Sequence, residues 1–434
     1  MASRLHIAFL SEHASPLALL GGQEAGGQNV YVDEVSRQLG AMGCQVDIFT
    51  RRDNPDLPEV VALAPGVRVV NLIAGPPEDI PKDDLWMLMA EFLDSLLGFM
   101  IRDGARYDLV HSHFWMSGWV AIQLRRRLGL PVVQTFHALG KTKQRHQGAA
   151  DTSPAARIAV EHDIARECDQ LIAQCPNERG ELIDDYAADP DKITLIPAAV
   201  NTNRFRPEPR DEARRRIGLA PADFVVVYVG RMLRRKGIRN LVRGFARLVE
   251  LAGNTASQRF RLVLVGGEAG ATDLYSTPEI DELRRLAQTL GIAELVCFAG
   301  QRQPEELRDF YSAGDVVVTT PWYEPFGLTS LEAMACARPV IGSAVGGLAY
   351  TIQDQLTGLL VPPRDPEALA SCLHRLLIQP ERGVAMGRAA RRRVEQEFTW
   401  ERVALRLLAL YRGLAPAETQ PDQLIELERG ALTL

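Results

Sequence analysis

The chain has 434 residues, too many for one hydrophobic core and enough for two domains of about 200 residues each. Apolar residues make up 46% and charged residues 24%, the balance of an ordinary soluble globular protein. The formal net charge of −6 excludes the strongly basic character of nucleic-acid-binding chains, so we expect no nucleic-acid partner.

The cysteines and the N-terminus indicate the compartment. Six cysteines are scattered without a C-x-x-C pair, which predicts neither a disulfide framework nor a zinc site. No basic region followed by an apolar run opens the chain, and no stretch of about 18 apolar residues occurs. We therefore expect a cytoplasmic protein with no secretory signal and no integral membrane segment.

Short apolar, β-branched runs alternate with helix-length segments along the whole chain. Candidate strands fall at 5–10, 45–50, 67–73, 109–112, 132–136, 193–196, 224–229, 262–265, 295–298, 316–319, 340–343 and 358–361. Their continuous hydrophobicity is typical of parallel strands buried on both faces, and the alternation predicts doubly wound α/β domains. A proline- and arginine-rich break at 203–223 predicts a first domain over 1–205 and a second over 206–395.

A glycine-rich turn follows the first candidate strand. Four glycines lie within 21–27, immediately before a helical pattern that includes Val30, Val35 and Leu39. Such a turn lets backbone amides approach an anion at a helix N-terminus. It is neither a G-x-G-x-x-G fingerprint nor a P-loop. On these residues alone an anion site and a tight structural turn are equally good interpretations.

Charged residues follow two candidate strands of the second half. The strand 224–229 ends in Gly230-Arg231, with Lys236-Gly237 shortly after it, and strand ends at a sheet crevice are where α/β domains bind ligands. Arg231 and Lys236 suit a diphosphate. Glu324 and Glu332 flank Pro-Phe-Gly-Leu after the strand 316–319, where carboxylates can accept hydrogen bonds from sugar hydroxyls.

These residues resemble a known family. Glu324 and Glu332 look like the E-x7-E motif of family 4 of the retaining glycosyltransferases, and Gly230-Arg231 with Lys236-Gly237 resemble its donor-phosphate site. The segments 26–32, 111–115 and 135–139 resemble the branch of sucrose-phosphate synthases, mannosylfructose-phosphate synthases and the inositol-phosphate N-acetylglucosaminyltransferase of mycothiol biosynthesis. The likeness covers nearly the whole chain.

The resemblance implies the GT-B fold, which has two facing Rossmann-like domains with the active site in the cleft between them. It implies that the helices over 396–434 cross back onto the first domain. The reaction it implies is retaining transfer of a hexosyl unit from a nucleotide sugar, with UDP-glucose favoured as the donor and GDP as the second choice of nucleotide. No metal and no other cofactor is expected, because fixed cations can stabilise the departing diphosphate.

The resemblance also implies roles for individual residues at the donor site. Glu332 would hold the ribose, Glu324 the donor sugar, and Arg231 and Lys236 the diphosphate, with His137 near the transferred sugar. The remaining donor-site residues implied by the resemblance are Gly26, Gly27 and the backbone amides of Phe326, Gly327 and Leu328.

The acceptor implied by this branch is a sugar phosphate or polyol phosphate. Lys82 and Arg157 fall where a lysine and an arginine for the acceptor phosphate are expected. The further acceptor residues are Gln28, Asn29 and His113. Two departures from relatives stand out, because Phe114 replaces a tyrosine and Ala138 replaces a threonine or serine.

Three rival functions compete with this interpretation. A GT-B nucleotide-sugar epimerase is disfavoured by the E-x7-E spacing, and a non-catalytic sugar sensor by the full set of charged site residues. A nicotinamide dehydrogenase lacks its glycine fingerprint here. Transfer to an unphosphorylated sugar or another small acceptor remains the alternative within the same reaction class.

Overall fold

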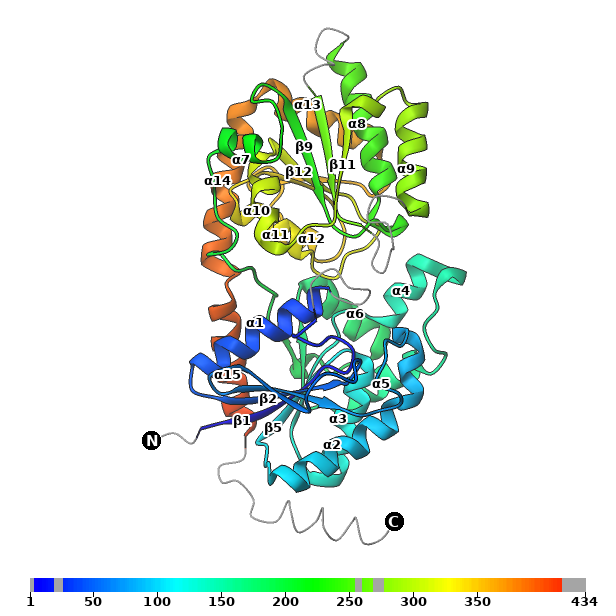
Figure 1. Ribbon diagram of the computed structural model, residues 1–434, viewed down its shortest axis with the longest axis vertical. Helices are drawn as coiled ribbons and strands as arrows, with labels where there is room; N and C mark the ends of the chain where they lie inside the picture. Colours follow the sequence, from blue (N-terminus) through cyan, green and yellow to red (C-terminus); the bar gives the residue numbers. More distant parts are fainter. Residues whose placement is uncertain (1–3, 19–25, 254–259, 268–276, 416–434) are drawn as a thin grey trace. The chain divides into compact units, whose positions relative to one another are not determined.

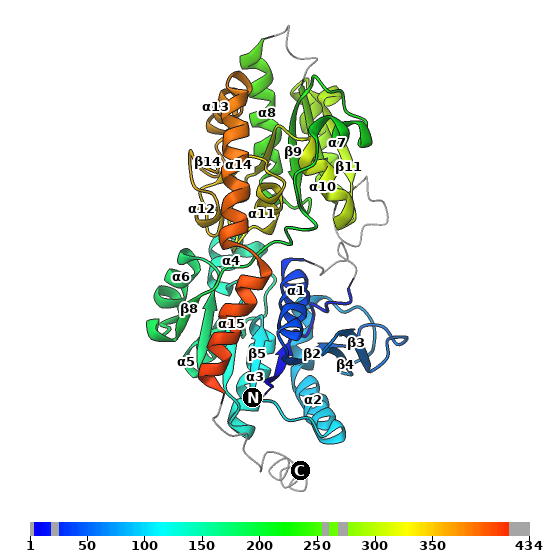
Figure 2. The same cartoon turned by 90° about the vertical axis from the view of Figure 1, so that its left-hand side faces the viewer.

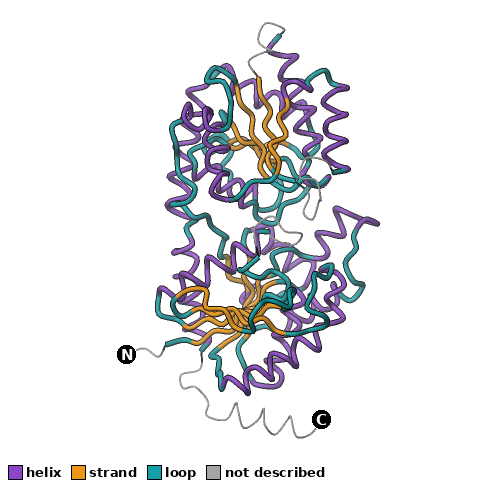
Figure 3. Tube along the Cα trace, viewed as in Figure 1, coloured by secondary structure: helices purple, strands orange, loops and turns teal. Residues whose placement is uncertain are grey.

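The computed structural model describes residues 4–18, 26–253, 260–267 and 277–415, which form two compact units (Figure 1). The first unit comprises the described residues up to Pro197 and the helix that begins at Trp400. The second comprises the described part of Ala198–Thr399. In each unit, helices cover both faces of one sheet (Figure 3).

The sheet of the first unit has eight strands among the described residues, in the order β3-β4-β2-β1-β5-β6-β7-β8. These strands are β1 (His6–Leu10), β2 (Gln45–Arg51), β3 (Val60–Ala64), β4 (Val67–Leu72), β5 (Leu109–His113), β6 (Val132–Thr135), β7 (Gln170–Ala173) and β8 (Ile193–Leu195). Its helices are α1 (Gly27–Ala41), α2 (Met89–Asp103), α3 (Trp115–Leu128), α4 (Gly140–Gln147), α5 (Arg157–Glu167), α6 (Pro176–Tyr186) and α15 (Trp400–Leu414), with a 3-10 turn η1 at Lys82–Leu88.

Strand β1 lies where the winding of the first sheet reverses. Ile7 pairs in parallel with Val46 of β2 on one side and with Leu109 of β5 on the other. The loops after β1 and β5 therefore leave the same edge of the sheet in opposite directions. Such a switch point is where open α/β sheets bind ligands.

Helix α15 belongs to the first unit although it follows the second unit in sequence. Its buried residues recur at helical spacing, which gives the helix one apolar stripe. These residues are Trp400, Val403, Ala404, Leu407, Leu408 and Tyr411. The helix packs along α1 (Figure 2), and Tyr411 reaches His111 of β5, with its hydroxyl 2.5 Å from Nδ1.

The second unit has a six-stranded parallel sheet among its described residues, in the order β11-β10-β9-β12-β13-β14. Its strands are β9 (Phe224–Val229), β10 (Phe260–Val265), β11 (Val296–Gly300), β12 (Val316–Thr319), β13 (Val340–Ser343) and β14 (Gly358–Val361). Its helices are α7 (Arg210–Arg216), α8 (Ile238–Ala252), α9 (Pro278–Thr289), α10 (Pro304–Ala313), α11 (Leu328–Ala335), α12 (Leu348–Thr351), α13 (Pro366–Ile378) and α14 (Pro380–Glu397).

Strand β9 is the switch strand of the second sheet. All of its residues after Phe224 are buried, as a continuous β-branched run predicts, and it lies between β10 and β12. The loops after β9 and β12 therefore start side by side. They carry the two charged segments identified in the sequence.

The parallel α/β architecture predicted from the sequence is confirmed, with small differences. All twelve predicted strands are present within a few residues, and two more occur, β3 and β7. The predicted boundaries at 205/206 and 395/396 compare with unit limits at Pro197/Ala198 and Thr399/Trp400. The segment 198–205 stays with the second unit because Val200 N donates to Phe398 O at 3.1 Å and Arg391 Nη1 donates to Phe205 O at 2.9 Å.

Candidate active site

The loop after β9 carries the predicted phosphate-binding cations. Arg231 is exposed at the end of the strand, and its carbonyl accepts a hydrogen bond of 2.9 Å from the hydroxyl of Tyr228. Lys236 ends a 3-10 turn (η4, Arg234–Lys236), and Gly237 follows with φ +71°. A Cβ at Gly237 would collide with the carbonyl oxygen of Thr320, so only glycine allows the two loops to touch.

That close approach brings Lys236 to Glu324. The Thr320 hydroxyl donates to Gly237 O at 3.1 Å, and Trp322 N donates to Arg235 O at 2.9 Å. Lys236 Nζ then lies 2.5 Å from Glu324 Oε2, although 88 residues separate the two in sequence. The loop is also fixed by the segment after β13, because Gly347 N donates to Glu324 O at 3.0 Å.

The Lys236–Glu324 pair is held in its charged form. Burial alone would raise the pKa of Glu324, but the charges of Lys236, Arg235 and Arg231 outweigh it and leave this pKa below its ordinary value. Burial lowers the pKa of Lys236, and the carboxylate of Glu324 offsets part of that shift. An ionised carboxylate and an ammonium group thus stand together at the switch point of the second sheet.

Glu332 occupies a different electrostatic environment on α11. Burial raises its pKa to about 7, against opposing effects of the Tyr311 hydroxyl and the charge of Arg204. Its Oε2 accepts a hydrogen bond of 2.6 Å from Tyr311 of α10. Phe326, Gly327 and Leu328, the predicted amide donors, form the turn that opens α11. Of the two glutamates, only Glu324 is held charged well below neutral pH.

Three histidines of the first unit, His111, His113 and His137, lie together near the ends of β5 and β6. His137 follows β6 with φ +59°, a left-handed backbone uncommon for a residue with a side chain, and its Nε2 lies 3.0 Å from Nδ1 of His113. Burial lowers the pKa of His137 to about 3, with a further contribution from His13, so the ring is neutral at pH 7. Burial, together with the charges of His111 and His137, also holds the pKa of His113 well below its ordinary value.

The hydrogen bond between these two rings assigns their protons. His113 is 0% exposed and, within the described part of the chain, its Nε2 has no hydrogen-bond partner. An orphaned buried N–H is rarer than an orphaned acceptor, which puts the proton of His113 on Nδ1, where it is donated to His137. His137 then carries its own proton on Nδ1. A neutral imidazole of this kind can orient a sugar hydroxyl.

The residues of the glycine-rich turn lie around the start of α1. Residues 21–25 are outside the described part of the chain, while Gly26 caps α1 and Gly27 is its first residue. Gln28 Nε2 donates to Ser11 Oγ at 3.1 Å. Asn29 is buried, with its Nδ2 donating to Ser15 O and its Oδ1 accepting from Gly26 N, both at 2.9 Å. Asn29 therefore ties the loop after β1 to the helix.

Lys82 and Arg157 converge on one ring, that of Phe114. Phe114 follows β5 with φ +77°, and its ring centroid lies 5.9 Å from Lys82 Nζ and 5.0 Å from the guanidinium of Arg157. The ring of His113 packs instead against Phe9 and Tyr31. Arg157 itself is 2% exposed and paired with Glu161.

Sequence reasoning missed several residues that hold the site residues in place. Tyr311, Glu161 and Tyr186 each make a hydrogen bond to a site element, and none belongs to a motif. The one sequence signal is the spacing of Arg157 and Glu161 by four residues, which puts them on one face of a helix.

Among the described residues, no group of three or more His, Cys, Asp or Glu side chains could hold a metal ion. None of the helices in the same residues has the length and apolar character needed to cross a bilayer.

Two family models match the chain. The model described as "Glycosyltransferase Family 4" matches residues 25–204, and the model described as "Glycosyl transferases group 1" matches residues 209–393. With the paired parallel-sheet units and the charged switch-point loops, these matches define a glycosyltransferase of the GT-B fold.

Relatives that match nearly the whole chain show which glycosyltransferase family it belongs to. The D-inositol 3-phosphate glycosyltransferase of Acidothermus cellulolyticus is 38% identical over 420 residues, which is 96% of this chain and 92% of the relative. That of Kineococcus radiotolerans is 40% identical over 94% of each chain. The structure of sucrose-phosphate synthase from Thermosynechococcus elongatus has a TM-score of 0.84 at 37% identity, covering 95% of this chain and 99% of the other. The chain belongs to glycosyltransferase family 4.

Proposed function

We propose that this enzyme transfers a hexosyl unit, with retention of anomeric configuration, from a UDP-sugar to a sugar phosphate or polyol phosphate. UDP-glucose is the favoured donor. The observation that supports the nucleotide-sugar donor is the Lys236–Glu324 pair. It puts a cation and a carboxylate able to bind hydroxyls 2.5 Å apart on adjacent loops. The names of the relatives support the acceptor half, since each names a phosphorylated polyol or sugar.

The donor would be held by the second unit. Arg231 and Lys236 would bind the diphosphate, Glu324 the hexose and Glu332 the ribose, while the turn 326–328 would offer backbone amides to sugar hydroxyls. As the bond to the diphosphate breaks, negative charge develops on the leaving group. Two fixed cations stabilise that charge, so no metal or other cofactor is required.

The acceptor would be held by the first unit. Lys82 and Arg157, which both face the Phe114 ring, would bind its phosphate. Gly26, Gly27, Gln28 and Asn29 would border the acceptor at the start of α1. His137, neutral and protonated on Nδ1, would orient the transferred sugar rather than act as a nucleophile.

A matrix of donors and acceptors tests the proposal. UDP-glucose, UDP-N-acetylglucosamine and GDP-mannose are each combined with fructose 6-phosphate, inositol phosphate or the unphosphorylated forms, and release of nucleoside diphosphate is measured. We expect rapid release only with a phosphorylated acceptor. Equal rates with unphosphorylated acceptors would support the alternative acceptor class, and an epimerised sugar without acceptor would identify an epimerase.

A further inference from the structure

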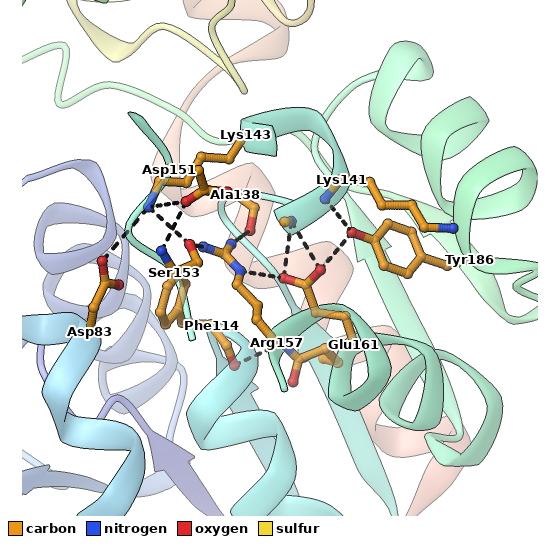
Figure 4. A network of polar contacts seen from close by, with 12 residues as sticks. Asp83, Phe114, Ala138, Lys141, Lys143, Asp151, Ser153, Arg157, Glu161 and Tyr186 are labelled. Atoms are coloured by element: carbon orange, nitrogen blue, oxygen red, sulfur yellow. Dashed lines mark hydrogen bonds and ion pairs between the residues drawn. The ribbon is translucent and has the colours of Figure 1, made fainter. Parts of the chain in front are cut away.

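A buried carboxylate, Glu161 of α5, anchors the backbone that follows His137 (Figure 4). Glu161 is 0% exposed, and hydrogen-bond donors from three helices approach its carboxylate. Gly140 N lies 2.9 Å from Oε2, Arg157 Nε lies 2.8 Å from Oε1, and the Tyr186 hydroxyl lies 2.5 Å from Oε2. Because all three partners donate, a carboxylate satisfies them together, whereas an amide would turn its own N–H groups toward one of them.

The Arg157–Glu161 pair holds both ends of a short backbone segment. Arg157 Nη2 donates to Ala138 O at 2.7 Å, and Glu161 accepts from Gly140 N. A Cβ at Gly140 would lie 2.7 Å from Glu161 Oε2, so glycine is needed for the carboxylate to come this close. The segment 138–140 directly follows His137, whose backbone is already in the left-handed region. The ion pair therefore fixes the chain next to a strained site residue.

The carboxylate of Glu161 also fixes the orientation of the Arg157 guanidinium. A guanidinium has five N–H donors, and three of those of Arg157 have acceptors among the described residues, namely Glu161, Ala138 and the Ser153 hydroxyl at 3.2 Å. Among the described residues, one N–H on each Nη of Arg157 therefore remains for a ligand. The Ser153 oxygen also accepts from Lys143 Nζ at 2.9 Å, and Lys143 is itself paired with Asp151 at 3.0 Å.

We propose that Glu161 is a positioning residue for the acceptor. It orients the Arg157 guanidinium and the 138–140 backbone, so that the remaining N–H groups of Arg157 meet the acceptor phosphate in a fixed geometry. Glu161 does not itself contact the phosphate, since both are negatively charged. This role rests on the proposed function, because it takes Arg157 as a ligand of the acceptor phosphate.

Steady-state kinetics of Glu161→Gln test the proposal, with inositol phosphate and inositol as acceptor probes and the best donor from the matrix. Losing one charge-assisted hydrogen bond should raise the KM for inositol phosphate about tenfold. The donor KM and the KM for inositol should stay near the wild-type values. Glu167→Gln is the matched control, because Glu167 lies on the same helix but pairs with the surface side chain of Arg126.

A double-mutant cycle separates positioning from a general effect on folding. If Glu161 acts through Arg157, Arg157→Lys and Glu161→Gln should be non-additive in their effect on the KM for inositol phosphate. Tyr186→Phe removes one donor while keeping the charge, and should raise that KM about threefold even if Glu161→Gln fails to fold.

The outcomes are distinct. A KM for inositol phosphate that is unchanged in Glu161→Gln, or in Tyr186→Phe where the first variant does not fold, overturns the positioning role. Equal changes in donor and acceptor KM overturn it too, since they indicate a structural effect alone. Wild-type enzyme that prefers neither inositol phosphate nor fructose 6-phosphate over the unphosphorylated form instead contradicts the proposed function.

Discussion

Glu332 should make donor binding depend on pH close to neutrality. Burial raises the pKa of its carboxyl to about 7, and the carboxylate, which accepts from Tyr311 at 2.6 Å, is the form suited to accept hydrogen bonds from both ribose hydroxyls. Donor binding should therefore strengthen as the pH rises through 7 and weaken as it falls. The neutral acid predominates on the acid side.

The magnitude follows from the ionised fraction. With a pKa of about 7, Glu332 is roughly 10% ionised at pH 6 and roughly 90% ionised at pH 8. If only the carboxylate binds ribose, the apparent Kd is the intrinsic Kd divided by this fraction, so affinity should rise about tenfold over the two pH units. That factor corresponds to about 1.4 kcal/mol.

Calorimetric titration with UDP-glucose from pH 6 to pH 8 measures this dependence. An intact nucleotide sugar suits the purpose because its esterified phosphates do not titrate in this range, unlike the terminal phosphate of UDP. Glu332→Gln should bind more weakly and show a flat profile. Tyr311→Phe, which removes a donor that lowers the pKa of Glu332, should move the midpoint to higher pH. A Kd for the wild type that is constant from pH 6 to pH 8 would refute the reasoning.

Three further predictions concern the remaining site residues. Glu324→Gln should fold normally but lower kcat about 100-fold, because the contact of Glu324 with the donor should strengthen in the transition state. Wild-type turnover in this variant would show that Glu324 does not contact the donor. Exhaustive chelation should leave activity nearly unchanged, and a loss restored by magnesium or manganese would show that Arg231 and Lys236 do not suffice. Burial lowers the pKa of His111 to about 3, so as the pH falls below 6.5 the unfolded chain binds a proton that the folded chain does not. The unfolding free energy should therefore fall by about 1.6 kcal/mol between pH 6.5 and 5. His111→Phe should abolish that part of the slope in denaturant titrations, and an unchanged slope would show that His111 is not its source.

Much of the fold could be read from local sequence because its strands are buried on both faces. A run such as Phe224–Val229 needs no tertiary information to be recognised. The two missed strands lack that signal for different reasons. Strand β3 is an antiparallel edge strand with no fully buried residue, and β7 has a single β-branched residue, Ile172, in a run that opens on a glutamine.

The proximity of the two proposed donor loops was predictable because each follows a recognisable strand, and the parallel topology then brings the loops together. Lys236 and Glu324 meet for this reason despite their separation in sequence. The network around Glu161 could not be predicted in the same way. Its partners come from α4, α5 and α6, and a buried glutamate on an amphipathic helix looks like any surface glutamate until the helices are packed.

The most direct test of the proposed reaction is a proton NMR time course of the product formed from α-linked UDP-glucose and a phosphorylated acceptor, fructose 6-phosphate or inositol phosphate. Retaining transfer predicts a new anomeric signal with the small coupling of an α-linkage, appearing only when the acceptor is present. A β-linked product, or free glucose as the sole product, would contradict it.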